Sequence, residues 1–111
     1  MWEIELEPEV REWFEQLPPR AVAIVTFNIN RLAHQGAALR MPHSRSLGDG
    51  LFELRFDIER SSRRITFFFP GERRIVLLTV FRKQRQNEQT EIARSRLAMK
   101  RCIAEDHNAH E

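Results

Sequence analysis

Residues 51–82, LFELRFDIERSSRRITFFFPGERRIVLLTVFR, decide the fold. Apolar side chains occupy positions 52, 54, 56 and 58 of this stretch, and charged side chains occupy positions 53, 55, 57 and 59. Such an alternation is typical of a strand with one buried face. Turn residues at Ser61-Ser62 and Pro70-Gly71 then separate two further β-rich segments, RRITFFF and RRIVLLTVFR. The stretch therefore predicts an antiparallel meander of three strands.

The residues before the meander predict a strand and two helices. WEIEL, at residues 2–6, alternates like a half-buried strand. Pro8 suits the first turn of a helix that ends before Pro18-Pro19, and the apolar residues of this helix fall on one face. A second helix is predicted from about residue 19 to 38, because its apolar residues recur at the helical period. Residues 41–50 are predicted to be a loop.

After the meander, residues 88–105 are predicted to form a third helix, with Ile92, Met99 and Ile103 on a narrow apolar face. The predicted order is β-α-α-β-β-β-α. This is an α+β fold in which the helices pack on one face of a small antiparallel sheet. We expect residues 1–106 to form a single domain and residues 107–111 to be a flexible C-terminal tail.

The composition limits the classes of protein to which the chain can belong. With 111 residues and 41% hydrophobic content, the chain suits one domain with a modest core. It has no apolar run of the ~18 residues that a membrane span needs, and its acidic start does not resemble a signal peptide. A single cysteine, Cys102, allows no internal disulfide. We therefore expect a cytoplasmic protein with no membrane association.

Charge is distributed unevenly along the chain, although the net charge is only +2. Residues 1–17 contain six Glu and one Arg, a net charge of −5. Residues 31–101 contain sixteen Lys or Arg and seven Asp or Glu, a net charge of +9. Nearly all these cations are arginines, whose planar fork suits phosphate. The asymmetry favours an anionic partner, with nucleic acid as the first candidate.

The third meander strand is apolar on both faces, so its alternation alone does not show which face points to the core. We assign Val76, Leu78 and Val80 to the core because they form its uniformly apolar set. The opposite face then carries Thr79, Phe81 and Lys83.

The polar faces of the first two meander strands contribute Arg55 and Arg64. We expect these two arginines to gather with Phe81 and Lys83 on one uncovered face of the sheet. Cations that meet phosphates beside a ring that stacks on a base are typical of RNA-binding sheets. The alternative is that the arginines are ordinary solvent-exposed residues.

Other reactive side chains do not form a recognisable site. Cys102, His107 and His110 superficially resemble a metal cluster, but the cysteine points towards the apolar helix face and the histidines lie in the polar tail. We therefore predict no metal site. His34 and His43 are interpreted as structural or exposed.

The ordered motifs resemble a known family. LGDGLFELRF at residues 47–56, RRITFFF at 63–69 and RRIVLLTVFRKQRQNEQTEIARSRLAMKR at 73–101 resemble the phage-derived, HigB-type branch of the RelE/ParE toxin superfamily. In that branch a dGLwElR strand precedes an R-I-x-Y/F strand and an I-V-L-L-x-x-F-x-K-K strand that leads into a helix. WEIELEPEVREWFEQL at residues 2–17 also resembles the usual start.

The resemblance implies a type II toxin with the RelE-like microbial RNase fold. Such toxins inhibit translation by cutting messenger RNA, usually in the ribosomal A site. The implied reaction needs no metal or other cofactor. The 2′-hydroxyl attacks the adjacent phosphate, which yields a 2′,3′-cyclic phosphate and a 5′-hydroxyl end.

The family's basic residues map onto named positions of this sequence. Arg55 and Arg64 would clamp the phosphate, where fixed cations stabilise the charge of the transition state. Lys83 is the candidate for proton transfer, because neighbouring cations can lower a lysine pKa while arginine stays charged. The residues expected to contact RNA are Phe81, Arg82, Thr79 and Arg85. The pattern leaves open whether Arg85 simply faces solvent.

Two other functions stay open at this point. A ParE-like toxin that poisons DNA gyrase would share the fold, but the set Arg55, Arg64 and Lys83 argues against it. A non-catalytic RNA- or protein-binding module is the other alternative. Either toxin reading implies a helix-turn-helix antitoxin of the HigA type, which would bind operator DNA as a complex with the toxin.

Overall fold

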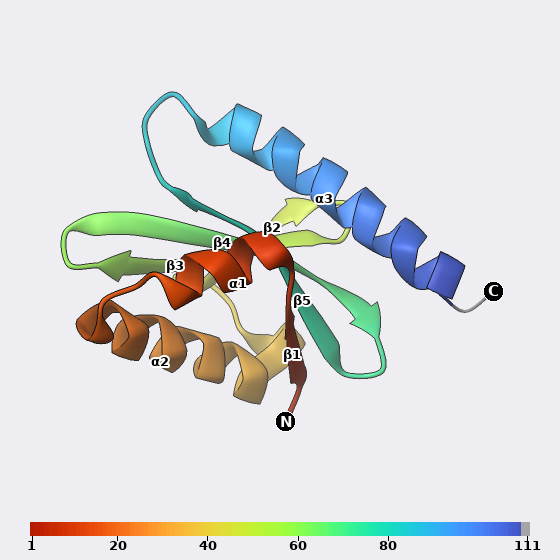
Figure 1. Cartoon of the computed structure of the whole chain (residues 1–111), viewed down its shortest axis with the longest axis horizontal. Coiled ribbons are helices and arrows are strands. Elements are labelled where there is room, and N and C mark those ends of the chain that lie inside the picture. Colours follow the sequence, from red (N-terminus) through yellow and green to blue (C-terminus); the bar gives the residue numbers. More distant parts are fainter. Residues whose placement is uncertain (110–111) are drawn as a thin grey trace.

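The computed structural model describes residues 1–109, with the backbone alone at residues 107–109. The chain forms a five-stranded sheet, three α-helices and one short 3-10 helix (Figure 1). In chain order the elements are β1 (Glu3–Leu6), α1 (Pro8–Glu15), α2 (Pro19–Gln35), η1 (Gly36–Ala38), β2 (Ser44–Gly48), β3 (Leu51–Ile58), β4 (Ser61–Gly71), β5 (Arg74–Arg82) and α3 (Glu88–Ala109).

The strands lie in the order β1-β5-β4-β3-β2. The predicted meander is confirmed as β3, β4 and β5, which pair antiparallel. β1 pairs parallel with β5, so the sheet is mixed rather than purely antiparallel. β2 pairs with β3 inside the segment that was predicted to be a loop. The sequence of β2, SRSLG, has no apolar alternation, so this edge strand depends on the backbone of β3.

The α+β class is confirmed, but the prediction that all helices pack on one face is wrong. α1 and α2 cover one face of the sheet, and α3 lies across from them (Figure 1). The α1–α2 side holds the larger core, which is formed by Val10, Val25, Leu32, Leu39, Leu54, Phe56, Ile65, Phe67, Ile75 and Leu77. Beneath α3 lies a second core of Leu51, Phe68, Val76 and Leu78. The central strands carry apolar residues on both faces, so both faces require cover.

A β-bulge in β5 explains why the core assignment for this strand is only half right. Thr66 pairs with Thr79 and Phe67 pairs with Leu77, so Leu78 is an extra residue on β5. Up to and including the bulge, Val76 and Leu78 are core residues as predicted, but they face α3, the same side as Thr79 and Phe81, whereas the prediction put the two sets on opposite faces. After the bulge, Val80 packs towards the α1–α2 core as predicted.

The predicted helices are confirmed, with changes at two ends. α2 is followed by η1, where Gly36 has a φ of +52° and lies so close to Trp2 that a Cβ would be 2.0 Å from the indole Nε1. α3 runs to Ala109 rather than ending near residue 105, because no glycine or proline stops it. Of the predicted tail, His110 and Glu111 lie outside the described residues. Among the residues that are described, no helix is long and apolar enough to cross a membrane.

Candidate functional site

The candidate site is a grid of side chains on the α3 face of β3, β4 and β5. Paired residues of neighbouring strands point to the same face, so the strand register defines rows across the sheet. The three rows are Glu53–Thr66–Thr79, Arg55–Arg64–Phe81 and Asp57–Ser62–Lys83. Neighbouring rows are two residues, or about 7 Å, apart along the strands. The bulge in β5 places Thr79 and Phe81 on this face.

The middle row brings together three predicted site residues. Arg55 pairs with Arg64, and Arg64 pairs with Phe81. Arg64 and Phe81 are each only 7% exposed, whereas Arg55 is half-buried. The face is therefore not the uncovered surface that was predicted. A shallow pocket of about 220 Å³, lined in part by Arg55, Arg64 and Ser62, opens to solvent at this end of the grid.

Burial and like charge affect Arg64 directly. Burial lowers the pKa of the Arg64 guanidinium, and the positive charge of Arg55 lowers it further, while Glu53 acts in the opposite direction. Arginine nevertheless stays charged in proteins. The row therefore concentrates two cations in a partly dry environment, where their attraction for an anion is stronger than in water.

Lys83 ends the third row at the mouth of the site. Its backbone N–H donates to the Ser62 carbonyl, and its Nζ donates to Glu88 Oε1 at 3.0 Å. Arg45 of β2 also approaches Glu88, at 3.9 Å. The hydrogen bond from Lys83 lowers the pKa of Glu88. In this structure Lys83 is thus a hydrogen-bond donor, which suits charge stabilisation or protonation of a leaving oxygen.

Thr79 is buried, contrary to the expectation that it contacts RNA. It is 1% exposed, and its hydroxyl bonds to Thr66 Oγ1 at 2.6 Å and to Ser95 Oγ at 2.7 Å. Ser95 in turn donates to the Glu91 carbonyl of α3. This buried hydroxyl chain (Thr66, Thr79 and Ser95) fastens α3 to the sheet, so the Thr79 hydroxyl is not available to a ligand.

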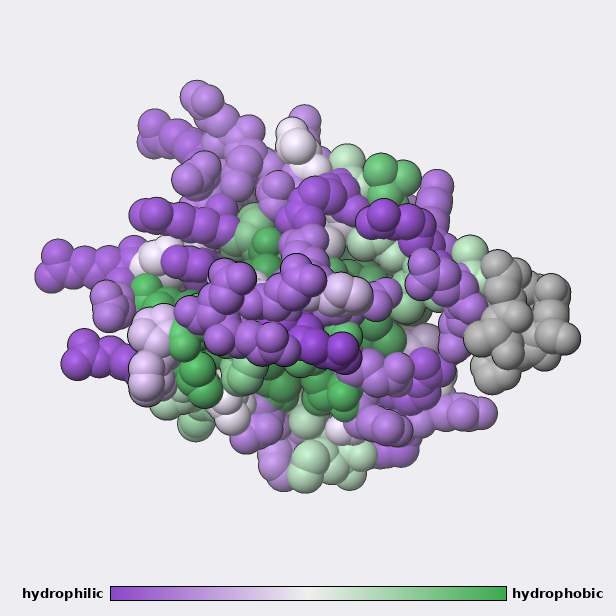
Figure 2. Space-filling model, viewed as in Figure 1, coloured by the Kyte–Doolittle hydropathy of each residue, from purple (hydrophilic) through white to green (hydrophobic). Residues whose placement is uncertain are grey.

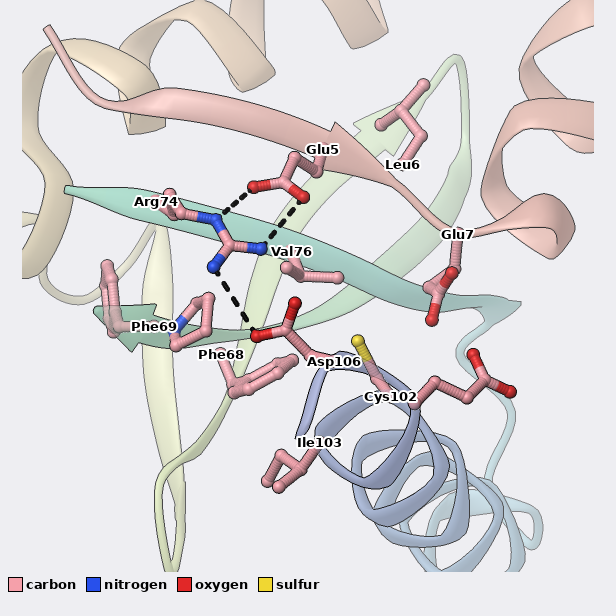
Figure 3. A pocket seen from close by; sticks show the side chains of 12 residues that line it. Glu5, Leu6, Glu7, Phe68, Phe69, Arg74, Val76, Cys102, Ile103 and Asp106 are labelled. Atoms are coloured by element: carbon pink, nitrogen blue, oxygen red, sulfur yellow. Dashed lines mark hydrogen bonds and ion pairs between the residues drawn. The ribbon is translucent and has the colours of Figure 1, made fainter. Parts of the chain in front are cut away.

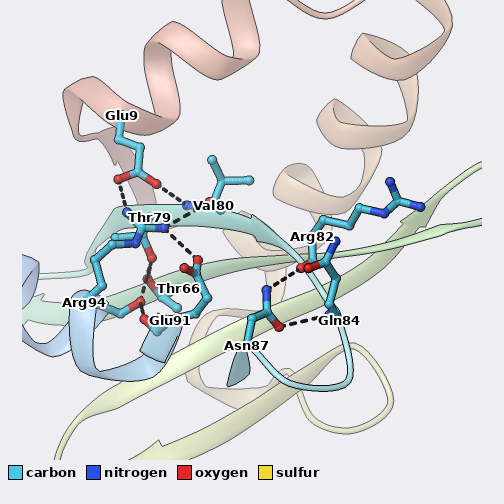
Figure 4. Close-up of polar contacts among 10 residues, drawn as sticks. Glu9, Thr66, Thr79, Val80, Arg82, Gln84, Asn87, Glu91 and Arg94 are labelled. Carbon is cyan, nitrogen blue, oxygen red and sulfur yellow. Dashed lines mark hydrogen bonds and ion pairs between the residues drawn. The ribbon is translucent and has the colours of Figure 1, made fainter. Parts of the chain in front are cut away.

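Two arginines of α3 hold the helix in place at its sides. Arg94 forms an ion pair with Glu9 of α1, and Glu9 also accepts a hydrogen bond from the Val80 N–H (Figure 4). On the other side, Arg96 donates to the carbonyls of Leu47 and Gly48 in β2. These contacts fix α3 over the Thr79 end of the grid and leave the Lys83 end open.

The remaining predicted RNA contacts lie outside the grid. Arg82 follows Phe81 on β5 and therefore points to the opposite face, where it lines a pocket of about 430 Å³ with Arg20, Arg60 and Arg63. Its carbonyl accepts a hydrogen bond from Asn87, which shapes the turn into α3 (Figure 4). Arg85 is exposed in that turn.

A pocket of about 680 Å³, larger than the one at the arginine pair, lies elsewhere in the molecule. It lies between β1 and the C-terminal half of α3, where Arg74 binds Glu5 with two hydrogen bonds and approaches Asp106 (Figure 3). Burial raises the pKa of the Cys102 thiol in this pocket to about 12, with a contribution from Glu7. A thiol of this kind is not a reactive nucleophile. We therefore place the candidate site at the grid rather than here.

Charged and polar side chains dominate the face of the molecule that Figure 1 views. Figure 2 shows hydrophilic side chains over most of one face, with apolar side chains in hollows between them. Within residues 1–106, whose side chains are described, no group of three or more His, Cys, Asp and Glu residues is placed to hold a metal ion.

Comparisons with known proteins define the class of this chain. Residues 12–102 match the profile of the family described as "Phage derived protein Gp49-like", and the chain belongs to this family. The fold is that of the RelE-like toxins: the crystal structure of the isolated E. coli RelE toxin aligns with a TM-score of 0.58. That alignment covers 85% of this chain and 97% of RelE at 9% identity. The search of curated proteins gives no match.

These findings confirm the predicted phage-derived family and the predicted RelE-like fold. The residue that sequence reasoning missed is Glu53, which lies beneath the arginine pair and is 1% exposed. Strand alternation assigned it to the polar face and hence to solvent. Only its burial and its position between two arginines distinguish Glu53 from Asp57, the other acidic residue of β3.

Proposed function

We propose that the protein is the toxin of a type II toxin–antitoxin system, and that it inhibits translation by metal-free cleavage of messenger RNA on the ribosome. The observation that carries the proposal is the register pair of Arg55 and Arg64, two cations side by side in a partly buried row. The RelE-like fold and the Gp49-like family membership support the same reading.

The grid suits a reaction in which negative charge builds up on the phosphate group in the transition state. The 2′-hydroxyl of one nucleotide attacks the adjacent phosphate and gives up its proton to water, the bond to O5′ breaks, and a 2′,3′-cyclic phosphate forms. Arg55 and Arg64 would meet the phosphate oxygens and stabilise the additional negative charge. Lys83 lies one row further along and would donate a proton to the leaving O5′. Glu88 pairs with Lys83 in the free protein, so RNA would compete with this carboxylate for the ammonium group.

The residues around the grid suggest how RNA is positioned. Phe81 lies beside Arg64 but is almost fully buried, so it would support the arginine unless the ribosome opens this face. Arg82 and Arg85 lie near the same end of β5 and would contact phosphates of neighbouring nucleotides. In the cell we expect a cytoplasmic toxin whose partner, a HigA-like helix-turn-helix antitoxin, covers the cationic end of the sheet.

The proposal is tested with purified protein in a translation reaction of known messenger RNA. Primer extension should detect new 5′ ends in the presence of ribosomes and none on free RNA, and the upstream fragments should carry 2′,3′-cyclic phosphates. Arg55→Ala and Arg64→Ala should each lower the cleavage rate by about a hundredfold. Arg73→Ala, which removes an exposed cation at the far end of β5, is the matched control and should retain cleavage.

A result in which both arginine variants remain fully toxic would contradict the nuclease proposal. Inhibition of DNA supercoiling by the purified protein would then point to a gyrase poison. Absence of growth arrest on expression would instead favour a non-catalytic binding module.

A further inference from the structure

A buried carboxylate lies beneath the arginine pair and has no role in the reaction as described so far. Glu53 is 1% exposed, and neither of its oxygens accepts a hydrogen bond from the described residues. Burying a carboxylate without hydrogen-bond donors is costly, because the lost hydration is not replaced. The position of this side chain therefore calls for an explanation.

Within the described chain, Glu53 forms ion pairs with the two arginines. Oε1 lies 3.5 Å from Arg55 Nη1 and 3.8 Å from Arg64 Nε. Both distances exceed those of good hydrogen bonds, so the contacts are ion pairs rather than direct bonds. Arg55 and Arg64 face each other on neighbouring strands, where like charges repel. One carboxylate placed between them offsets that repulsion and draws both guanidinium groups to a common point.

The geometry also selects which edge of Arg64 remains available. Glu53 faces its Nε, and Nη1 donates to the Arg63 carbonyl at 3.0 Å. Nη2 forms no hydrogen bond within the described residues. Arg64 Nε has no hydrogen-bond partner among the described residues, so the Nη1 bond and the ion pair with Glu53 orient the guanidinium group and leave Nη2 to donate to a phosphate oxygen.

We propose that Glu53 is a positioning residue, whose carboxylate holds Arg55 and Arg64 in the arrangement in which both meet one phosphate. This inference rests on the proposed function, because the phosphate is that of the cleaved RNA. Fixing catalytic groups in a productive geometry accelerates a reaction without any direct contact to the substrate.

The central experiment replaces Glu53 by glutamine, which keeps the size of the side chain and removes its charge. We expect kcat for ribosome-dependent cleavage to fall at least tenfold. Affinity for a short 2′-O-methyl RNA, which cannot be cleaved, should be unchanged or a few-fold tighter because the site gains positive charge. Opposite changes in turnover and affinity distinguish loss of positioning from loss of structure, which would weaken both.

Glu72→Gln is the matched control, since Glu72 is an exposed acid in the turn between β4 and β5, outside the grid. It adds the same positive charge and should leave kcat within about twofold of the wild type. Glu53→Asp is a second variant that keeps the charge but shortens the reach, and it should give an intermediate kcat. If Glu53→Gln does not fold, the kcat of Glu53→Asp provides the test of the proposal. A kcat equal to that of the wild type in either folded Glu53 variant overturns the proposal.

An NMR measurement separates this inference from the proposed function. If Glu53 restrains Arg64, hydrogen exchange at Arg64 Nε–H should be several-fold faster in Glu53→Gln than in the wild type or Glu72→Gln. Should the wild-type protein fail to cleave RNA, the proposed function falls, and this exchange rate still decides whether Glu53 fixes the arginines. An unchanged exchange rate would overturn the positioning role.

Discussion

Replacing Thr79 by valine tests the hydroxyl chain that fastens α3 to the sheet. Valine has nearly the same shape, so the change removes the hydroxyl with little change in packing. Both bonds of that hydroxyl, to Thr66 at 2.6 Å and to Ser95 at 2.7 Å, are lost. Ser95 keeps its bond to the Glu91 carbonyl, whereas Thr66 is left as a buried hydroxyl without this partner.

The magnitude follows from these contacts. Two neutral hydrogen bonds contribute about 1 kcal/mol each, and an unpaired buried hydroxyl costs about 1–3 kcal/mol, with some of this returned by the more apolar side chain. We therefore expect Thr79→Val to lower the free energy of unfolding by about 2 kcal/mol. Thr66→Val leaves the Thr79–Ser95 bond intact and should cost about 1 kcal/mol.

The double variant provides the sharper test. Once Thr79 is valine, removal of the Thr66 hydroxyl no longer breaks a bond and instead removes an unpaired group, so the two changes should not add. Urea unfolding, followed by the fluorescence of Trp2 and Trp13, measures all four proteins. A loss below about 0.5 kcal/mol in Thr79→Val, or strict additivity in the double variant, would refute the hydroxyl chain as a fastening of α3.

Three further predictions use other contacts of the structure. Gly36→Ala should lower the free energy of unfolding by about 3 kcal/mol or more, because the new Cβ would lie 2.0 Å from Trp2 Nε1 on a backbone with φ +52°; a loss under about 1 kcal/mol in urea unfolding would contradict this packing. The pair with Lys83 lowers the pKa of Glu88 from its ordinary value of 4.5, so the pair stabilises the fold fully at a pH above 4.5. This stabilisation is lost as the pH falls through the lowered pKa of Glu88. Unfolding curves of the wild type and Glu88→Gln should therefore differ near pH 7 and converge at about pH 3, and a constant difference would argue against the pair. Arg82→Gln should reduce the slope of log affinity for single-stranded RNA against log salt concentration by about 0.7, the value for one phosphate contact; an unchanged slope in fluorescence titrations would place Arg82 outside the RNA path.

The meander could be predicted from sequence because its strands alternate and its turns carry Ser, Pro and Gly. β2 could not be predicted, because SRSLG lacks alternation and pairs only through the backbone of β3. The placement of α3 was missed for a related reason. Its apolar stripe is narrow, and Ser95 at the centre of its contact with the sheet is polar, so the sequence does not show how firmly this helix is held.

The candidate site was partly predictable. Alternation alone places Arg55 and Arg64 on one face, and the register then makes them neighbours. Exposure could not be predicted, because it depends on how α3 lies over β5, and Thr79 and Phe81 are consequently buried. Glu53 could not be recognised either, since an acidic residue on the polar side of a strand ordinarily faces water.

The extra residue at Leu78 has a consequence for how variation in β5 is interpreted. The bulge reverses the alternation of side chains along the strand. Up to Leu78 the even-numbered residues face α3, and after it the odd-numbered residues do. If the same residues alternated strictly, without the bulge, Thr79, Phe81 and Lys83 would turn towards α2, and Val80 would replace Phe81 beside Arg64. The chemistry of this face therefore depends on how β5 pairs with β4 as well as on the identity of its residues, and a related chain with the same sequence but no bulge would present a different surface to its partner.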